Sequence, residues 1–259
     1  MNSKFSDIKS ISVFRLALAV GFAFLCFSSI GVAGPPYITD DPEPVEYRHW
    51  EFYLASLSTH DPDGWSGTAP HAEINYGAAP NLQLHVIAPF SFSAPKNGVF
   101  RYGYGDTELG AKYRFIQETG LRPQVGEFVL FEVPTGDSNR GLGSGHLQVF
   151  LPIWLQKSFG PWLMYGGGGY WMTTGVANQN WWYVGYLLQY QLRPALNVGV
   201  ELFHTTPKDE NSESETRFNF GAVYDFSELH HLMASAGRGI QGSNLFQSYL
   251  AYQLTIGAK

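Results

Sequence analysis

The side chains of this sequence that could do chemistry are charged residues and histidines that recur at every second position, between apolar residues. In the segment 81–92, for example, Gln83 and His85 alternate with Leu82, Leu84 and Val86. This is the period of a β-strand, whose successive side chains point to opposite faces. We interpret the polar faces as the lining of a barrel lumen, with these candidate residues: Glu51, Glu73, His85, Glu108, Lys112, Arg114, Glu201 and Arg217.

The sequence leaves two roles open for these lumen-facing charges. Both signs occur among them, so they could neutralise one another across a closed interior. They could equally line a narrow path whose charges select a solute, since lumen residues of membrane barrels serve either purpose.

Metal and cofactor chemistry finds little support in the sequence. The histidines on the polar faces lack a ligand spacing such as His-x-x-x-His. Asp40, Asp41 and Glu43 cluster in a proline-rich stretch and could hold a cation, but a solvated turn explains them as well. No nucleotide or redox motif is found, and we therefore expect no metal and no cofactor.

One pair of residues keeps an enzymatic alternative open. Ser144 and His146 stand two apart at the start of a predicted strand, which places both side chains on one face. A barrel that hydrolyses lipids needs a serine and a histidine near its rim, but here the shared face is the lumenal one. A Gly-x-Ser-x-Gly elbow is absent. We expect no enzyme, and keep an outer-membrane lipid hydrolase as an alternative.

The elements that must position these residues are about twelve segments of about ten residues each, between Tyr47 and Ile256. Tilted strands of about this length cross a bilayer, and a closed barrel satisfies their backbone groups. The breaks are alternately long and short, as in outer-membrane barrels. We therefore predict an all-β fold, an antiparallel transmembrane β-barrel over 46–259. Long extracellular loops are expected near 58–68, 93–104, 134–144, 173–179, 206–215 and 240–244, and short periplasmic turns near 78–80, 118–122, 158–161, 193–194 and 227–230.

Two segments break the alternation. The segment 123–133 has no clear phase, because Glu127 and Glu132 fall on opposite faces. The segment 162–172 contains four consecutive glycines, 166–169, which are poor strand formers. In a barrel wall such glycines mark either a bend or a place where another group packs close to the wall.

The N-terminus has the pattern of a cleaved signal peptide, 1–33. Lys4, Lys9 and Arg15 precede an apolar run, and Gly31-Val32-Ala33 supplies small residues at a cleavage site. Cys26, the only cysteine, lies in that run, so the mature chain has no thiol. The stretch 34–45 is too rich in proline for a central strand. We expect it to be an extended periplasmic lead-in to a barrel in the bacterial outer membrane, and it could tuck into the mouth of that barrel.

The net charge of −6, with no cluster of lysine and arginine, argues against a nucleic-acid partner. The expected partners are outer-membrane lipid and a small-molecule solute, and the oligomeric state stays open. Aromatic residues make up 16% of the chain, which suits the girdles of a membrane barrel.

Two stretches resemble the MetA-pathway of phenol degradation family of outer-membrane proteins. The first is GPPYITDDPEPVEYRHWEFY, 34–53, and the second is GDTELGAKYRF, 105–115, followed by Pro134-Thr-Gly-Asp137 and Gly141-Leu-Gly143. The resemblance covers the N-terminal half of the chain. It implies an outer-membrane barrel that takes up aromatic or other small hydrophobic compounds, and it carries over no binding residues.

We therefore expect an outer-membrane channel or transporter for small aromatic or hydrophobic solutes. The alternatives are the lipid hydrolase, a structural barrel with a closed lumen, and a secreted soluble β-protein.

Overall fold

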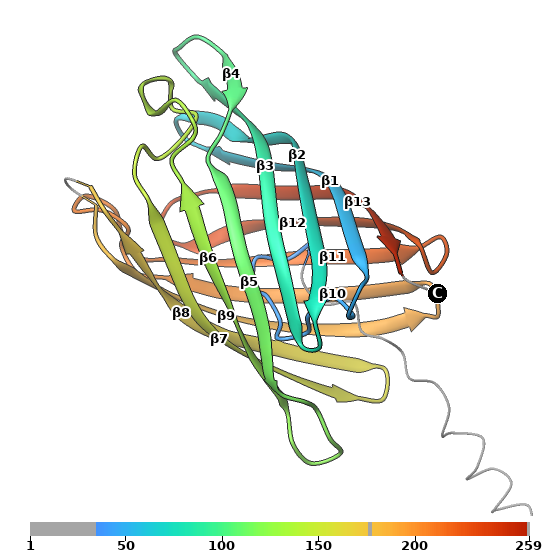
Figure 1. Ribbon diagram of the computed structural model, residues 1–259. Helices are drawn as coiled ribbons and strands as arrows, with labels where there is room; N and C mark the ends of the chain where they lie inside the picture. Colours follow the sequence, from blue (N-terminus) through green and yellow to red (C-terminus); the bar gives the residue numbers. More distant parts are fainter. Residues whose placement is uncertain (1–34, 176–177, 258–259) are drawn as a thin grey trace, which may run out of the picture. The chain divides into compact units, whose positions relative to one another are not determined.

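A closed ring of antiparallel strands forms the fold of the described part of the chain (Figure 1). The computed structural model describes residues 35–175 and 178–257. The predicted signal peptide, 1–33, lies outside the described residues. The strands are β1 (Trp50–Asp61), β2 (Gly64–Ala79), β3 (Leu82–Pro95), β4 (Arg101–Tyr104), β5 (Thr107–Ile116), β6 (Gln124–Val133), β7 (Gln148–Phe159), β8 (Trp162–Thr173), β9 (Trp181–Arg193), β10 (Leu196–Thr205), β11 (Glu215–Asp225), β12 (His230–Gln241) and β13 (Phe246–Ile256).

Each strand pairs with its neighbours in sequence, and β1 closes the ring by pairing with β13 from Trp50↔Ile256 to His60↔Phe246. β4 and β5 both pair with β3, one after the other along its length, so they fill a single position. The ring therefore has twelve positions, and the predicted twelve-stranded barrel is confirmed.

The hairpin connections lie at two ends, as the predicted loops and turns require, but two loops are shorter than expected. β1 extends to Asp61 and β2 begins at Gly64, so the loop expected at 58–68 is a two-residue turn. The loop expected at 93–104 lies mostly in β3 and β4, which pair from Phe90↔Tyr104 to Ser93↔Arg101. Both errors have one cause, because polar strand ends beyond the apolar band do not differ from loops in composition.

The inner and outer faces follow the alternation of the sequence. Outward-facing apolar side chains are well exposed, such as Leu54 at 60%, Trp182 at 55% and Phe220 at 60%. Inward-facing polar side chains are buried, such as Gln83, Asn219 and Gln253. The core of this fold is thus the barrel interior. Among the described residues the single helical turn is Ser138–Arg140, and no helix is long and apolar enough to span a membrane.

Candidate functional site

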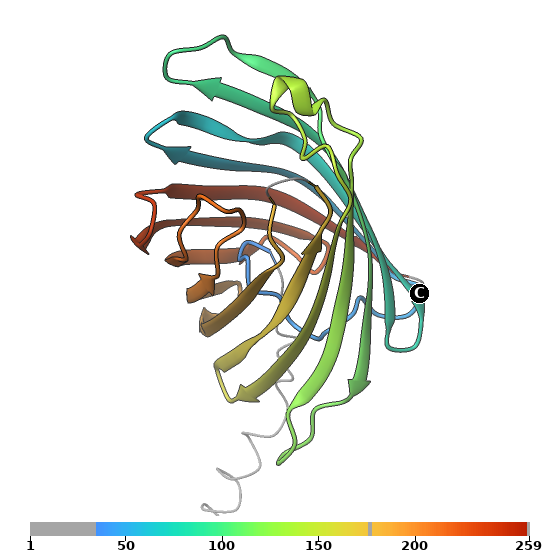
Figure 2. The ribbon, with the colours of Figure 1, turned by 90° about the vertical axis from the view of Figure 1, so that its left-hand side faces the viewer.

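The barrel interior is crossed by residues 35–45, which we call the lumenal segment (Figures 1 and 2, blue). Thr39 and Asp41 in it are fully buried. Its first residues are held by β9 to β12 and its last by β3 and β5. In the ring order β5 and β11 are six places apart out of twelve, so the segment connects opposite walls.

The first half of the lumenal segment is held by hydrogen bonds to its backbone. The Glu201 carboxylate on β10 accepts from the backbone N–H groups of Ile38, at 3.3 Å, and Thr39. Ser235 Oγ on β12 donates to the Pro36 carbonyl at 2.5 Å. Thr39 Oγ1 lies 2.9 Å from the Tyr183 hydroxyl of β9. These contacts satisfy backbone groups of a segment that forms no strand itself.

Glycines on three adjacent strands make room for this half of the segment. A Cβ at Gly185 would lie 2.1 Å from Thr39 Oγ1, and a Cβ at Gly199 would lie 2.5 Å from the Tyr37 hydroxyl. At Gly221 it would lie 2.7 Å from the Tyr37 ring. The three glycines therefore form a seat for Tyr37 and Thr39. These two residues fit there because the wall has no side chains at the three positions.

The second half of the lumenal segment is acidic and meets side-chain cations of β5. Lys112 Nζ lies 2.9 Å from Asp40 Oδ1 and 3.4 Å from Asp41 Oδ2. Arg114 Nη1 donates to Glu43 Oε1 at 2.5 Å. Asp40, Asp41 and Glu43, which the sequence suggested as a possible cation-binding cluster, are thus paired with the side chains of Lys112 and Arg114. Burial raises the pKa of the Asp41 carboxyl, and the Lys112 ammonium opposes that rise.

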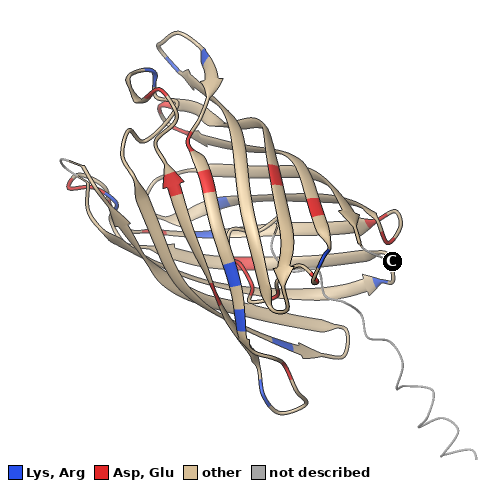
Figure 3. Cartoon of the chain, in the orientation of Figure 1, with Lys and Arg blue, Asp and Glu red and all other residues tan. Residues whose placement is uncertain are grey.

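A second charged group lies in the interior on β2, β3 and β5. His85 Nε2 is 2.8 Å from Glu108 Oε1, and His85 Nδ1 is 3.6 Å from Glu73 Oε1. Asn75 bridges His85 and Glu73. Its side-chain oxygen lies 2.6 Å from His85 Nδ1, and its amide nitrogen lies 2.8 Å from the Glu73 carboxylate. Figure 3 shows charges of both signs along the strands.

The eight candidate residues from the sequence all lie on the inner face, but in separate groups. Lys112, Arg114 and Glu201 contact the lumenal segment, and Glu73, His85 and Glu108 form the cluster just described. Two candidates belong to neither group. Glu51 accepts from the Tyr53 hydroxyl at 2.7 Å, and Arg217 pairs with Glu215 on its own strand.

Beside the lumenal segment lies a cavity of about 310 Å³ that we call the aromatic chamber. Its floor includes residues 35–38 and Asp40, and one polar wall carries His71, Glu73, His85 and Glu108. Tyr249 also lines it, and the buried hydroxyl of this residue has no hydrogen-bond partner among the described residues. The adjoining wall is aromatic and includes Phe128, Phe150, Trp171, Trp181 and Tyr183.

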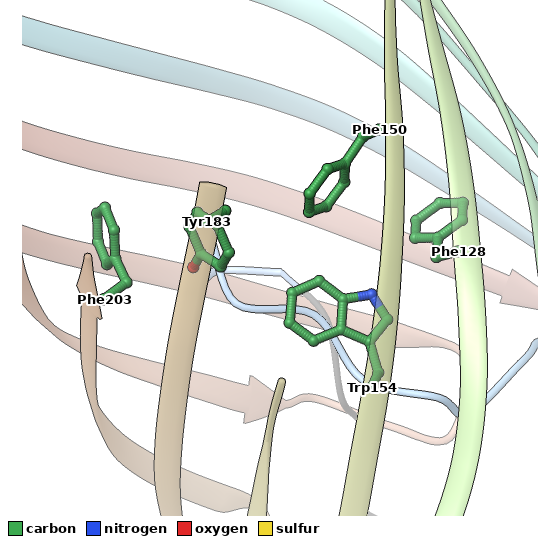
Figure 4. Packing of buried hydrophobic residues seen from close by; sticks show 5 residues of the cluster. All are labelled: Phe128, Phe150, Trp154, Tyr183 and Phe203. Atoms are coloured by element: carbon green, nitrogen blue, oxygen red, sulfur yellow. The ribbon is translucent and has the colours of Figure 1, made fainter. Parts of the chain in front are cut away.

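The aromatic wall belongs to a packed set of rings, of which Figure 4 shows Phe128, Phe150, Trp154, Tyr183 and Phe203. Phe150 stacks on Trp171 with ring centroids 4.8 Å apart, and Trp171 stacks on Trp181 at 5.4 Å. Phe150 meets Trp154 and Tyr183 edge to face, each at 6.2 Å. Offset and edge contacts of this kind are the favoured geometries of aromatic pairs.

Sequence reasoning missed the aromatic wall, although a signal was present. Gln148 and Gln156 lie on the polar face of β7, and Phe150, Pro152 and Trp154 occupy the same face between them. The glycine run on β8 belongs to this wall. A Cβ at Gly169 would lie 2.6 Å from the Phe150 ring, and one at Gly167 would lie 3.0 Å from the Trp154 ring. The expectation of close packing against these glycines is confirmed.

The chamber borders a larger polar cavity at the long-loop end of the barrel. Trp171 and Trp181 line both the chamber and a cavity of about 460 Å³ that also contacts Glu132, His146 and Lys208. Lys208 Nζ lies over the Trp181 ring, 4.5 Å from its centroid. A polar cavity therefore lies between the loop residue Lys208 and the aromatic wall.

The Ser144 and His146 side chains do not form a nucleophile and base. Ser144 Oγ donates to Asp106 Oδ2 at 2.8 Å and to the His146 backbone carbonyl at 2.9 Å. The His146 ring instead contacts the Asn178 amide at 3.0 Å. Catalysis by this pair would need a hydrogen bond between the hydroxyl and the imidazole.

Comparison with known proteins gives the family. The model of the family described as "Putative MetA-pathway of phenol degradation" matches residues 74–255. The chain belongs to this family. The resemblance found in the sequence is confirmed, and the match extends well beyond the N-terminal half. A comparison with curated proteins found no match.

Solved structures show the same fold at low identity. A KdgM porin in complex with disordered oligogalacturonate is 10% identical, with TM-score 0.56, covering 79% of this chain and 98% of that one. The NanC porin is 7% identical, with TM-score 0.53 and coverage of 80% and 100%. The translocator domain of autotransporter NalP from Neisseria meningitidis is 11% identical, with TM-score 0.53 and coverage of 94% and 95%. These likenesses show an outer-membrane barrel fold.

Proposed function

We propose that this protein is an outer-membrane channel that takes up small aromatic or hydrophobic solutes through the aromatic chamber. The observation that carries the proposal is the chamber itself, in which five aromatic side chains face the lumen beside the lumenal segment. Lumens of membrane barrels are ordinarily polar, so an aromatic wall at mid-lumen has a use if the solute is itself aromatic.

Solute enters from the long-loop end, passes Lys208 and Trp181, and reaches the stacked rings of Phe150 and Trp171. The lumenal segment closes the direct path to the short-turn end, because it crosses between opposite walls. The family and the porin-like fold support a channel in the outer membrane. The cleaved signal peptide predicted at 1–33 would export the chain towards that membrane.

The test is the initial rate of uptake of radiolabelled toluene by Gram-negative cells that produce the full-length chain, compared with cells that carry an empty vector. Phe150→Ala removes one ring of the wall. An aromatic pair contributes about 0.5–1.5 kcal/mol, so uptake at low toluene concentration should fall about two- to twelve-fold. Phe220→Ala, which removes an exposed ring from the outer face, is the matched control.

Uptake no faster than the empty vector would reject the proposal and favour a structural barrel with a closed lumen. Equal loss in both alanine variants would show that general damage to the barrel, and not the chamber, sets the rate. The amount of folded barrel in each strain is read from its faster migration on unheated gels.

A further inference from the structure

Next to the aromatic chamber, the ladder between β6 and β7 is interrupted. Pairing along this seam runs from Gln124↔Gln156 to Gly126↔Trp154, and resumes from Leu130↔Phe150 to Glu132↔Gln148. The register is the same on both sides of the interruption. Residues 127–129 and 151–153 therefore lie opposite one another without backbone pairing.

The cause of the interruption is Pro152, at the middle of β7. Proline has no backbone N–H and cannot complete a ladder, so it is rare in central strands. On its other side β7 pairs with β8 without a break, including Pro152↔Gly169. Other described seams contain bulges that shift the register, whereas this one keeps its register and loses three consecutive pairs.

The seam adjoins the proposed binding site. Phe128 lies opposite Pro152 in the register, and Phe150 and Trp154 flank Pro152 on β7 (Figure 4). Phe128 and Phe150 both line the chamber. The outer side of the same positions carries Leu151 and Ile153, which are 46% and 45% exposed. Phe128, Pro152, Val129 and Leu151 thus connect the chamber with the outer face through apolar side chains, and Glu127 lies beside them on the outer face, opposite Ile153.

The path along the barrel axis, past the lumenal segment, is charged, unlike the apolar side chains at the seam. Beyond the chamber lie the lumenal segment and its ion pairs with Lys112 and Arg114. A small apolar molecule gains nothing there in exchange for displacing charged contacts. An unpaired seam in contact with lipid is also unusual, because backbone groups in a bilayer must normally be satisfied within the protein.

We infer that the solute leaves the aromatic chamber sideways, through the seam between β6 and β7, and enters the membrane. This inference rests on the proposed function and adds an exit route to it. The barrel then delivers its solute to the hydrocarbon layer, while the lumenal segment stays in place and keeps the axial path closed to ions and sugars.

A cross-link across the seam tests the inference. Val129 and Leu151 are opposite in the register and face outward, so Val129→Cys with Leu151→Cys closes the seam when oxidised. The matched control is Val198→Cys with Ala222→Cys on the continuous β10–β11 ladder, where these two residues are directly paired. Formation of each cross-link is read from gel migration with and without reductant.

Toluene uptake should fall about ten-fold in the oxidised seam variant, recover with reductant, and stay unchanged in the oxidised control. A second variant, Pro152→Ala, needs no cross-link, since it restores an N–H to the ladder, and it should also slow uptake. Ion conductance in planar bilayers should not change in any variant.

If the seam variant takes up toluene equally fast in its oxidised form and after treatment with reductant, the lateral exit is overturned. If the cross-link does not form, unchanged uptake by Pro152→Ala overturns it instead. A wild-type chain that takes up toluene no faster than the empty vector defeats the proposed function itself, which is a different outcome.

Discussion

The glycine seat predicts that one methyl group on the barrel wall will release the lumenal segment. A Cβ at Gly221 would lie 2.7 Å from Tyr37 Cε1 and 2.8 Å from Cζ. Carbon atoms do not approach so closely, and the rigid ring has no free end that can bend aside. Gly221→Ala should therefore push Tyr37 out of its seat.

The magnitude follows from the burial of Tyr37, whose side chain is 8% exposed. Burying a large apolar side chain contributes about 1.5–3 kcal/mol. Loss of that contribution would shift the equilibrium between the docked and released segment about 10- to 150-fold. The Lys112 and Arg114 ion pairs remain, so release of the first half of the segment is expected and not of the whole.

The assay is single-channel recording in planar bilayers with the purified full-length barrel. The fraction of time in a high-conductance state should rise in Gly221→Ala and also in Tyr37→Ala, which removes the same contact from the other side. Gly120→Ala is the control, because no atom lies within 4 Å of a Cβ at that turn position.

The double variant decides whether Gly221 acts through Tyr37. With Tyr37 already replaced by alanine, a methyl group at position 221 has nothing to displace. The two effects should therefore not add. Fully additive effects, or a Tyr37→Ala barrel that stays as closed as the wild type, would refute the reasoning.

Four further outcomes are expected. Lys112→Ala leaves Asp41 buried without its cation, a loss of about 3–5 kcal/mol in the docked segment, and should raise conductance and expose the segment to protease. Because burial raises the pKa of Asp41 in the docked state, docking takes up a proton, so opening should increase as pH rises above the ordinary aspartate range, and Asp41→Asn should abolish that dependence. Gly167→Ala places a Cβ 2.0 Å from the Ile153 carbonyl and should lower barrel stability by about 1–3 kcal/mol in urea titrations read on unheated gels, whereas Gly120→Ala should not. Tyr249→Phe removes the unpartnered chamber hydroxyl and should reduce uptake of p-cresol while leaving uptake of toluene unchanged.

The candidate site was foreseen in part. Alternation placed Glu73, His85, Glu108 and Lys112 on the inner face, because strand geometry fixes the face of every second residue. It could not show that Lys112 and Glu201 hold the lumenal segment, since these contacts join positions 72 and 162 residues apart. The aromatic wall was hidden for a related reason. Phe150 and Trp154 look like ordinary strand residues until their phase against Gln148 and Gln156 is counted.

Local periodicity and short-range turn chemistry are enough to predict the barrel, its twelve strand positions and the faces of those strands. What fills the interior depends on contacts between residues that are far apart in the sequence. Gly185, Gly199 and Gly221 lie on three adjacent strands, and they become a seat only because Tyr37 and Thr39, far away in the sequence, pack against them. The pairing of β6 with β7 sets Pro152 opposite Phe128, and the N–H that proline lacks interrupts the ladder beside the chamber. Packing between distant strands carries no local pattern, and that is why the sequence alone did not reveal it.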